Sequence, residues 1–167
     1  MAYRQWKEYD GYESYQHLEA GVDYEPFDLL EEISTFDPSP VELSADEEER
    51  LVDLMNDRTT VAVHEHPITH PRDMSEVLEY VSDRHVATHY AGLSQTPLDA
   101  VFDGLLHGLE IMDSKEGWRW DDVVADLSMR LDDITRSDLL VQGRTVEDIE
   151  RAHETGRIAW FPALEAL

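Results

Sequence analysis

Two histidines separated by one residue, His64 and His66, directly follow a short run of β-branched residues. The segment Thr59–Val63 consists mainly of threonine and valine, which predicts a buried strand that Pro67 ends. The two imidazoles can converge on one point if the strand end relaxes its regular alternation of side chains. Such a pair is typical of a metal site, and two ordinary loop histidines are the alternative.

The chain contains no cysteine, which excludes disulfides, thiol catalysis and cysteine-ligated zinc. Any metal must therefore be held by histidine and carboxylate. A second segment, Ile158–Glu165, is almost wholly apolar up to its final acid, which is typical of a parallel strand covered on both faces. If the two strands are parallel, their carboxyl ends share one edge, where His64, His66 and Glu165 can converge on one cation.

The elements that must position these residues are predicted from hydrophobic periodicity and capping residues. Four helices are expected: Ser44–Asp57, Asp73–Ser82, Trp120–Arg136 and Thr145–Thr155. Thr96 and Pro97 are expected to open a further helix, with Leu98, Val101, Phe102 and Leu105 on its core side. The alternative there is a short helix followed by a strand near His107–Met112, because two glycines interrupt the pattern.

The composition is strongly acidic, with 38 acidic and 13 basic residues in a chain of 167 and a formal net charge of -25. Only Lys7 and Lys115 are lysines, and this pattern resembles proteins of salt-accumulating halophiles of the haloarchaeal type. The charge is spread from Glu8 to Glu165, which argues against an acidic tail or a nucleic-acid mimic. Clustered bases that would bind nucleic acid are missing from the sequence. No apolar stretch approaches the ~20 residues that span a bilayer, so we expect a cytoplasmic protein of one domain.

Two ordered segments of the chain resemble a known family. The stretch from Val146 to Leu164, followed by Glu165, is similar to the one that precedes the metal-bridging glutamate of the membrane (renal) dipeptidases, a branch of the amidohydrolase superfamily. The stretch Trp118–Ile134 resembles the helix that this family places before it. For residues 58–167 the resemblance implies the first part of a (β/α)8 barrel, the TIM-barrel fold of metal-dependent hydrolases. Residues 1–57 are then an acidic N-terminal extension with one helix, and a further helical turn is expected near Phe27–Ile33.

The resemblance also implies a site with two zinc ions. His64 corresponds to the first-strand histidine of the family, and Glu165 corresponds to its bridging carboxylate. His66 stands where the family usually has aspartate, which makes the pair similar to the His-X-His of the wider superfamily. Ala166 and Leu167 replace two glycines, and the later two histidines and aspartate of the family have no counterpart. We therefore expect the front portion of such an enzyme.

Three functions are compatible with these residues. The first is a zinc-dependent, dipeptidase-like hydrolase, in which metal-activated water attacks the peptide bond of a small peptide or amide. The second is a non-catalytic acidic remnant or interaction module of the same fold. The third is an amidohydrolase that acts on another amide or ester. A second copy or another chain that supplies the rest of the barrel is a further expected partner, whereas nucleic acid and membrane are not.

We predict that folding of this chain requires salt, because its carboxylates repel one another at low ionic strength and screening relieves the repulsion. Circular dichroism and thermal melting across roughly 0.1 to 3 M KCl should show both helical signal and melting temperature rising with salt. A full helical signal and an unchanged melting temperature at the lowest salt concentration would contradict the halophilic interpretation.

Overall fold

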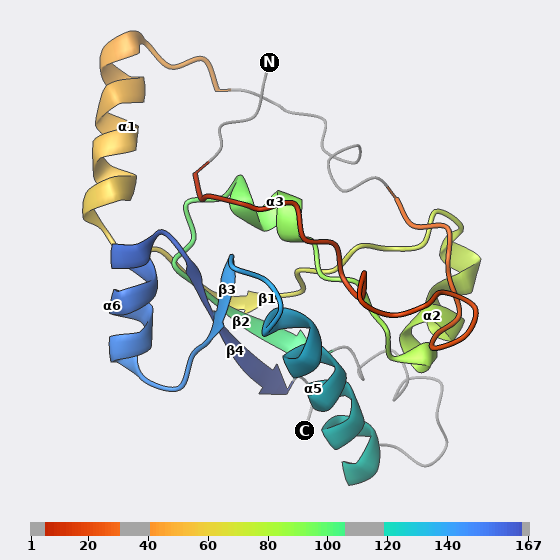
Figure 1. The fold of residues 1–167 in the computed structure, drawn as a ribbon. Helices are drawn as coiled ribbons and strands as arrows, with labels where there is room; N and C mark the ends of the chain where they lie inside the picture. The colour runs from red at the N-terminus through yellow and green to blue at the C-terminus, as the bar shows by residue number, and fades with distance from the viewer. Residues whose placement is uncertain (1–5, 31–40, 106–118, 165–167) are drawn as a thin grey trace.

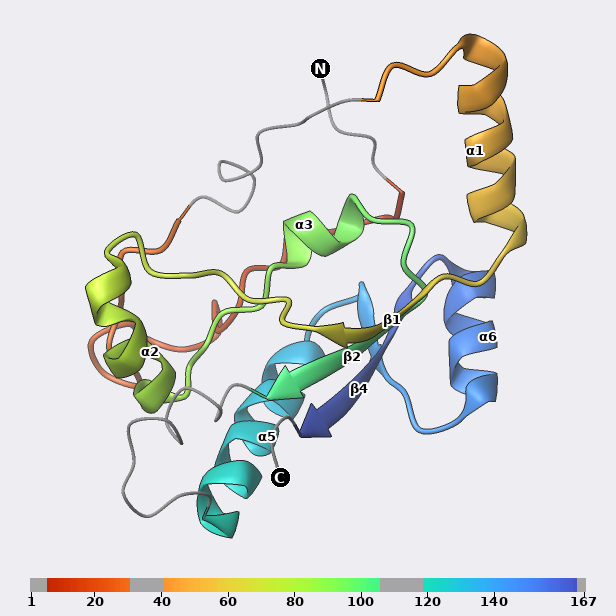
Figure 2. The same ribbon diagram turned by 180° about the vertical axis from the view of Figure 1, so that it is seen from behind.

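The structure is a computed structural model that describes residues 6–30, 41–105 and 119–164. Within these residues four parallel strands form one sheet in the order β1-β2-β4-β3. The strands are β1 (Val61–Glu65), β2 (Ala100–Leu105), β3 (Leu140–Gln142) and β4 (Ile158–Leu164). The three longer strands β1, β2 and β4 therefore lie side by side (Figure 2), and the short β3, which precedes β4 in the chain, pairs with β4 at the outer edge. The α/β class with a parallel sheet, expected from the sequence, is confirmed.

Helices lie on both sides of this sheet (Figure 1). The chain passes outward from β2 to β3 at the edge of the sheet and then back inward from β3 to β4. Right-handed crossovers in these two opposite directions are expected to place their two helices on opposite faces of the sheet. The packing agrees, since residues of α5 and α6 belong to different core clusters. The helical elements are α1 (Ala45–Asp57), the 3-10 helix η1 (Met74–Glu76), α2 (Val77–Asp83), α3 (Tyr90–Ser94), α5 (Trp120–Ile134) and α6 (Val146–Thr155). Among the described residues, no helix is both long and apolar enough to cross a bilayer.

The two faces of the sheet are packed differently. On one face α3, α5 and the N-terminal segment enclose large side chains, among them Tyr12, Tyr90, Ile134 and Trp160. On the other face α6 rests on small residues, because Ala152 meets Ala100 and Ala159 there. Residues 158–160 of β4 are almost completely buried, which confirms the prediction of a strand covered on both faces.

The helices expected over Ser44–Asp57 and Thr145–Thr155 are confirmed as α1 and α6, and each begins with a capping box. Ser44 and Glu47 form a capping box at the start of α1, and Thr145 and Asp148 form another at the start of α6. The helix predicted over Asp73–Ser82 is present as η1 and α2, and α5 ends two residues before the predicted Arg136. The strand predicted at Thr59–Val63 is shifted to Val61–Glu65, so that it contains the first histidine of the pair. The prediction that this strand is buried is wrong, because β1 lies at the edge of the described sheet and Val63 is 78% exposed.

The helix expected to begin at Thr96 is wrong, because residues 100–105 form β2. Its apolar residues match a helical period, but almost every position from 100 to 105 is buried, as in a strand between two layers. The alternative strand near His107–Met112 lies outside the described residues. The helical turn near Phe27–Ile33 is also wrong for its described part, since Leu29 forms an isolated bridge with Pro71 instead.

The N-terminal segment is attached to the core through the buried carboxylate of Asp133 on α5. This carboxylate accepts hydrogen bonds from the hydroxyls of Tyr12, Ser14 and Tyr90, each at 2.8 Å, and from the backbone N–H of Tyr15 at 3.0 Å. The Ser14 hydroxyl in turn accepts the N–H of Thr88 at 2.7 Å, ahead of α3. One side chain thus links α5, α3 and the N-terminal segment.

Replacing Asp133 with alanine should lower the free energy of unfolding by about 3–5 kcal/mol, because four donors, three of them buried, lose their acceptor together. The adjacent Asp132 is a matched control, since it lies at the surface and its carboxylate pairs with the exposed or half-buried His17 and Arg136. Asp132→Ala should cost less than about 1 kcal/mol. Denaturant titration in molar KCl measures both variants, and equal losses would contradict the central role of Asp133.

Buried tyrosines make the fold sensitive to alkali. Burial raises the pKa of Tyr80 to about 12, against an ordinary value of 10.0. Burial and the nearby Asp133 also raise the pKa values of Tyr12 and Tyr90. Since the unfolded chain releases these protons first, stability is complete below pH 10.0 and falls as the pH rises toward about 12. Melting temperatures across this range should decline less steeply in Tyr80→Phe than in Tyr24→Phe, a half-buried control.

Candidate metal-binding site

The end of β1 carries a break in the strand register at the position of the histidine pair. Ala62 pairs with Val101 and Glu65 pairs with Asp103, so two residues of β1 stand opposite the single residue Phe102 of β2. This is the arrangement of a β-bulge, which bends a strand locally and redirects a side chain. Convergence of the two histidines requires the strand end to relax its alternation of side chains, and the bulge provides this relaxation.

His64 is one of the two bulged residues, His66 follows the bulge, and their two imidazoles lie together. The ring centres of His64 and His66 are 5.0 Å apart, and the ring planes are almost perpendicular, at 89°. Two imidazoles on one tetrahedral zinc ion have ring centres about 5 Å apart, because each zinc–nitrogen bond is ~2.0–2.1 Å long. His64 is exposed and His66 is half-buried, so the pair is within reach of solvent.

The ring of His66 is oriented by a backbone carbonyl. Its Nδ1 lies 2.8 Å from the carbonyl oxygen of Gly104 on β2. A carbonyl can only accept a hydrogen bond, so Nδ1 carries the proton in this contact, and in the neutral ring Nε2 is then the nitrogen with the lone pair. Histidines that ligate metals characteristically hold the other ring nitrogen in this way.

The third residue expected at the site, Glu165, lies outside the described residues. The strand that leads to it is well placed, because Gly104 pairs with Ala163 and Leu105 pairs with Leu164 at the same edge of the sheet. Within the described residues, no group of three or more histidine, aspartate or glutamate side chains is arranged to hold a metal ion. The donor set of His64 and His66 thus suits zinc but provides two of its ligands.

A second cluster of charged residues, missed by the sequence analysis, lies at the opposite, amino ends of the strands. Lys7 donates to Oδ1 of Asp99 at 2.6 Å, and His153 Nδ1 lies 3.0 Å from Oδ2 of the same carboxylate. The backbone N–H of Thr60 also donates to Oδ2, at 2.8 Å. A cavity of about 130 Å³ adjoins the cluster. Lys7 is one of only two lysines, which is the one signal in the sequence that could have singled it out. Because these groups bind one another, the cluster anchors the N-terminal segment to the sheet.

A third buried group of charges supports the sheet behind the histidine pair. Asp103 of β2 accepts a hydrogen bond from Trp160 Nε1 at 2.8 Å and lies 3.7 Å from the guanidinium of Arg130. Burial lowers the pKa of that guanidinium, but Asp103, Asp126 and neighbouring tyrosines raise it above the ordinary value. Arg130 also donates to the backbone oxygen of Val86 at 3.0 Å.

Comparison of the chain with protein-family models, with curated proteins and with solved structures found no match. The resemblance to the membrane dipeptidases therefore rests on the ordered segments of the sequence, and it remains a prediction.

Proposed function

We propose that this chain carries part of the metal site of a zinc-dependent hydrolase of the dipeptidase type. The observation that carries the proposal is the bulge in β1, at which the rings of His64 and His66 lie 5.0 Å apart while Nδ1 of His66 contacts the Gly104 carbonyl. Nitrogen ligands without cysteine suit zinc, and Glu165 is the carboxylate that we propose as a further ligand.

The location of the pair supports the same function. In parallel α/β folds, ligands bind at the carboxyl ends of the strands, and His66 lies just beyond the carboxyl end of β1. The parallel pairing of β1 with β2 is that of adjacent strands in a (β/α)8 barrel, which is the fold that we propose for the complete site, whereas β4 lies between β2 and β3 in this sheet.

The role of each residue follows from its chemistry. Zinc, when bound, polarises a carbonyl and lowers the pKa of water, so that peptide or amide hydrolysis proceeds near neutral pH. His64 and His66 hold the ion as neutral ligands. Gly104 fixes the ring of His66 through its carbonyl. The substrate class is a small peptide or another small amide, and the complete site is proposed to hold two ions.

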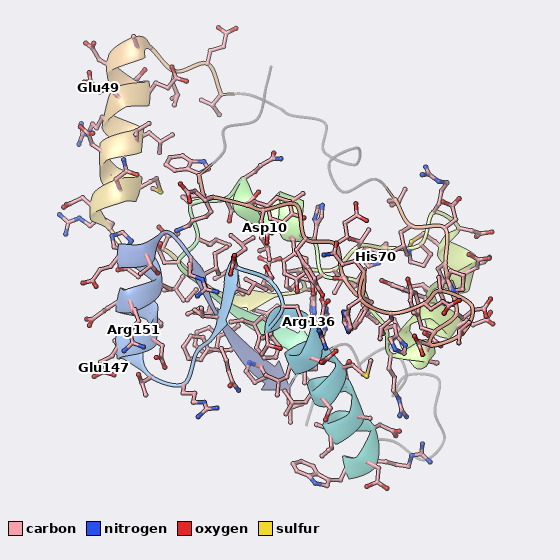
Figure 3. The ribbon with its side chains drawn as sticks, viewed as in Figure 1. Asp10, Glu49, His70, Arg136, Glu147 and Arg151 are labelled. Atoms are coloured by element: carbon pink, nitrogen blue, oxygen red, sulfur yellow. The ribbon has the colours of Figure 1, made fainter. Side chains whose placement is uncertain are left out.

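A non-catalytic interaction module is the second candidate, and α1 favours it. This helix has no buried residue, and Leu51 and Leu54 are 39% and 44% exposed. Figure 3 shows its side chains, Glu49 among them, projecting from a helix that stands away from the sheet. An amphipathic helix whose apolar residues are exposed is a feature that a partner-binding protein would also have.

The proposal predicts zinc binding that depends on the histidine pair. Equilibrium dialysis of the chain in molar KCl, followed by metal analysis, should show zinc uptake that falls at least tenfold in the double variant His64→Ala, His66→Ala, because two of the ligands are lost. The variant His70→Ala is the matched control, since this exposed histidine lies on the same loop outside the proposed site. Its zinc content should equal that of the wild type.

Hydrolysis assays then separate the candidate functions. Zinc-dependent cleavage of simple dipeptides that the double variant lacks would support the dipeptidase, and cleavage of other amides or esters alone would favour the third function. Zinc binding without hydrolysis would agree with a partial hydrolase site as well as with the interaction module, so zinc binding itself remains the test of the site. Equal zinc content in the wild type and the double variant would overturn the proposed site.

A further inference from the structure

A buried carboxylate lies directly beside the residue that orients His66. Asp103 is 1% exposed and precedes Gly104 on β2. The indole of Trp160 donates to its Oδ2 at 2.8 Å, across the pairing of β2 with β4. The guanidinium of Arg130, also 1% exposed, reaches the same oxygen at 3.7 Å from α5. Two neighbouring elements therefore hold this one side chain.

The residue that contacts His66 cannot hold itself in place. Gly104 has no side chain to pack, and glycine has the widest backbone freedom of any residue. Its carbonyl direction must be set by its neighbours along the strand and across the sheet. Asp103 and Leu105, the neighbours on either side of Gly104, are both 1% exposed, and Asp103 is the one that is held by polar contacts from two other elements.

Asp103 also marks the point at which β1 and β2 resume pairing after the bulge. Glu65, which separates the two histidines, is its partner in the register. A shift of β2 at Asp103 would therefore move both the bulged strand and the Gly104 carbonyl. The contacts of Asp103 act on the histidine pair through these two backbone connections.

We propose that Asp103, held by Trp160 and Arg130, is a positioning residue that fixes the Gly104 carbonyl and thereby aims Nε2 of His66 at a divalent cation. This inference rests on the proposed function, because it assumes that the pair binds such an ion. The network places no charge in the site itself. Through it, the positions of Arg130 on α5 and Trp160 on β4 determine the orientation of the ring of His66.

The experiment compares two buried aspartates that face the same arginine. Asp103→Asn keeps an acceptor for the Trp160 indole but removes the charge that attracts Arg130. Asp126→Asn is the matched control, because Asp126 is 5% exposed and acts on Arg130, but belongs to α5 and not to β2. Both variants remove one buried charge next to Arg130, so a merely structural effect would be similar in the two.

The first measurement is the zinc dissociation constant in molar KCl, by competition with a coloured chelator. We expect Asp103→Asn to weaken zinc binding by about tenfold or more, as losses around a ligating histidine do, and Asp126→Asn to stay within about threefold. Equal weakening in both variants, or unchanged affinity in a folded Asp103→Asn, would overturn the inference. If Asp103→Asn does not fold, Trp160→Phe removes the indole donor while keeping a ring, and the same comparison applies.

The second measurement needs no metal. Long-range proton–nitrogen correlation spectra, with the ring of His66 assigned through His66→Ala, report which ring nitrogen carries the proton. The wild type and Asp126→Asn should show the Nδ1-protonated tautomer, whereas Asp103→Asn should show a mixture. Absence of zinc binding by the wild type would overturn the proposed function, and the tautomer comparison would still decide the positioning role.

Discussion

The carboxylate of Asp133 shows the constraint under which this acidic chain folds. With 38 acids and 13 bases, the chain has few cations to spare for the carboxylates that enter its core. Asp133 is therefore satisfied by three hydroxyls and one backbone N–H rather than by a base. Its donors come from the N-terminal segment and from the start of α3, so satisfying this one buried charge requires those segments to fold against α5. The N-terminal segment, which the sequence indicated only as an extension, is in this way part of the core.

Hydrophobic pattern and capping residues were sufficient to predict most of the long elements. The capping boxes that begin α1 and α6 and the apolar run of β4 are local signals, and the structure has each of them. The strand β2 was mistaken for a helix because a strand buried on both faces has no alternation to reveal it. The three residues of β3 are too few to show any period. The contacts of Asp133, such as that with Tyr12 across 121 positions, connect residues that no local pattern relates.

The candidate site likewise combines features that local sequence predicts with features that only strand pairing produces. Residue type and spacing identified the histidine pair, and the need for a relaxed strand end followed from the alternation of side chains. The bulge that meets this need is a property of the register between β1 and β2, and the sequence of β1 alone does not contain it. The contact of His66 with Gly104 likewise depends on how two strands align. Both features arise from pairing, which a single sequence specifies only through the whole fold.

Imidazole ligands in the proposed zinc site also have a physical reason in a chain of this charge. A field of carboxylates raises the local concentration of every cation, but molar salt shortens the Debye length to about 3 Å and removes most of that attraction. A site built only of carboxylates would then be exposed to abundant alkali and alkaline-earth ions, which prefer oxygen ligands. Neutral nitrogen ligands favour zinc over those ions through short-range bonding that screening does not weaken. In the zinc site that we propose, selection for the metal therefore depends on how the two rings are oriented, and hence on the bulge and on the backbone contact of His66.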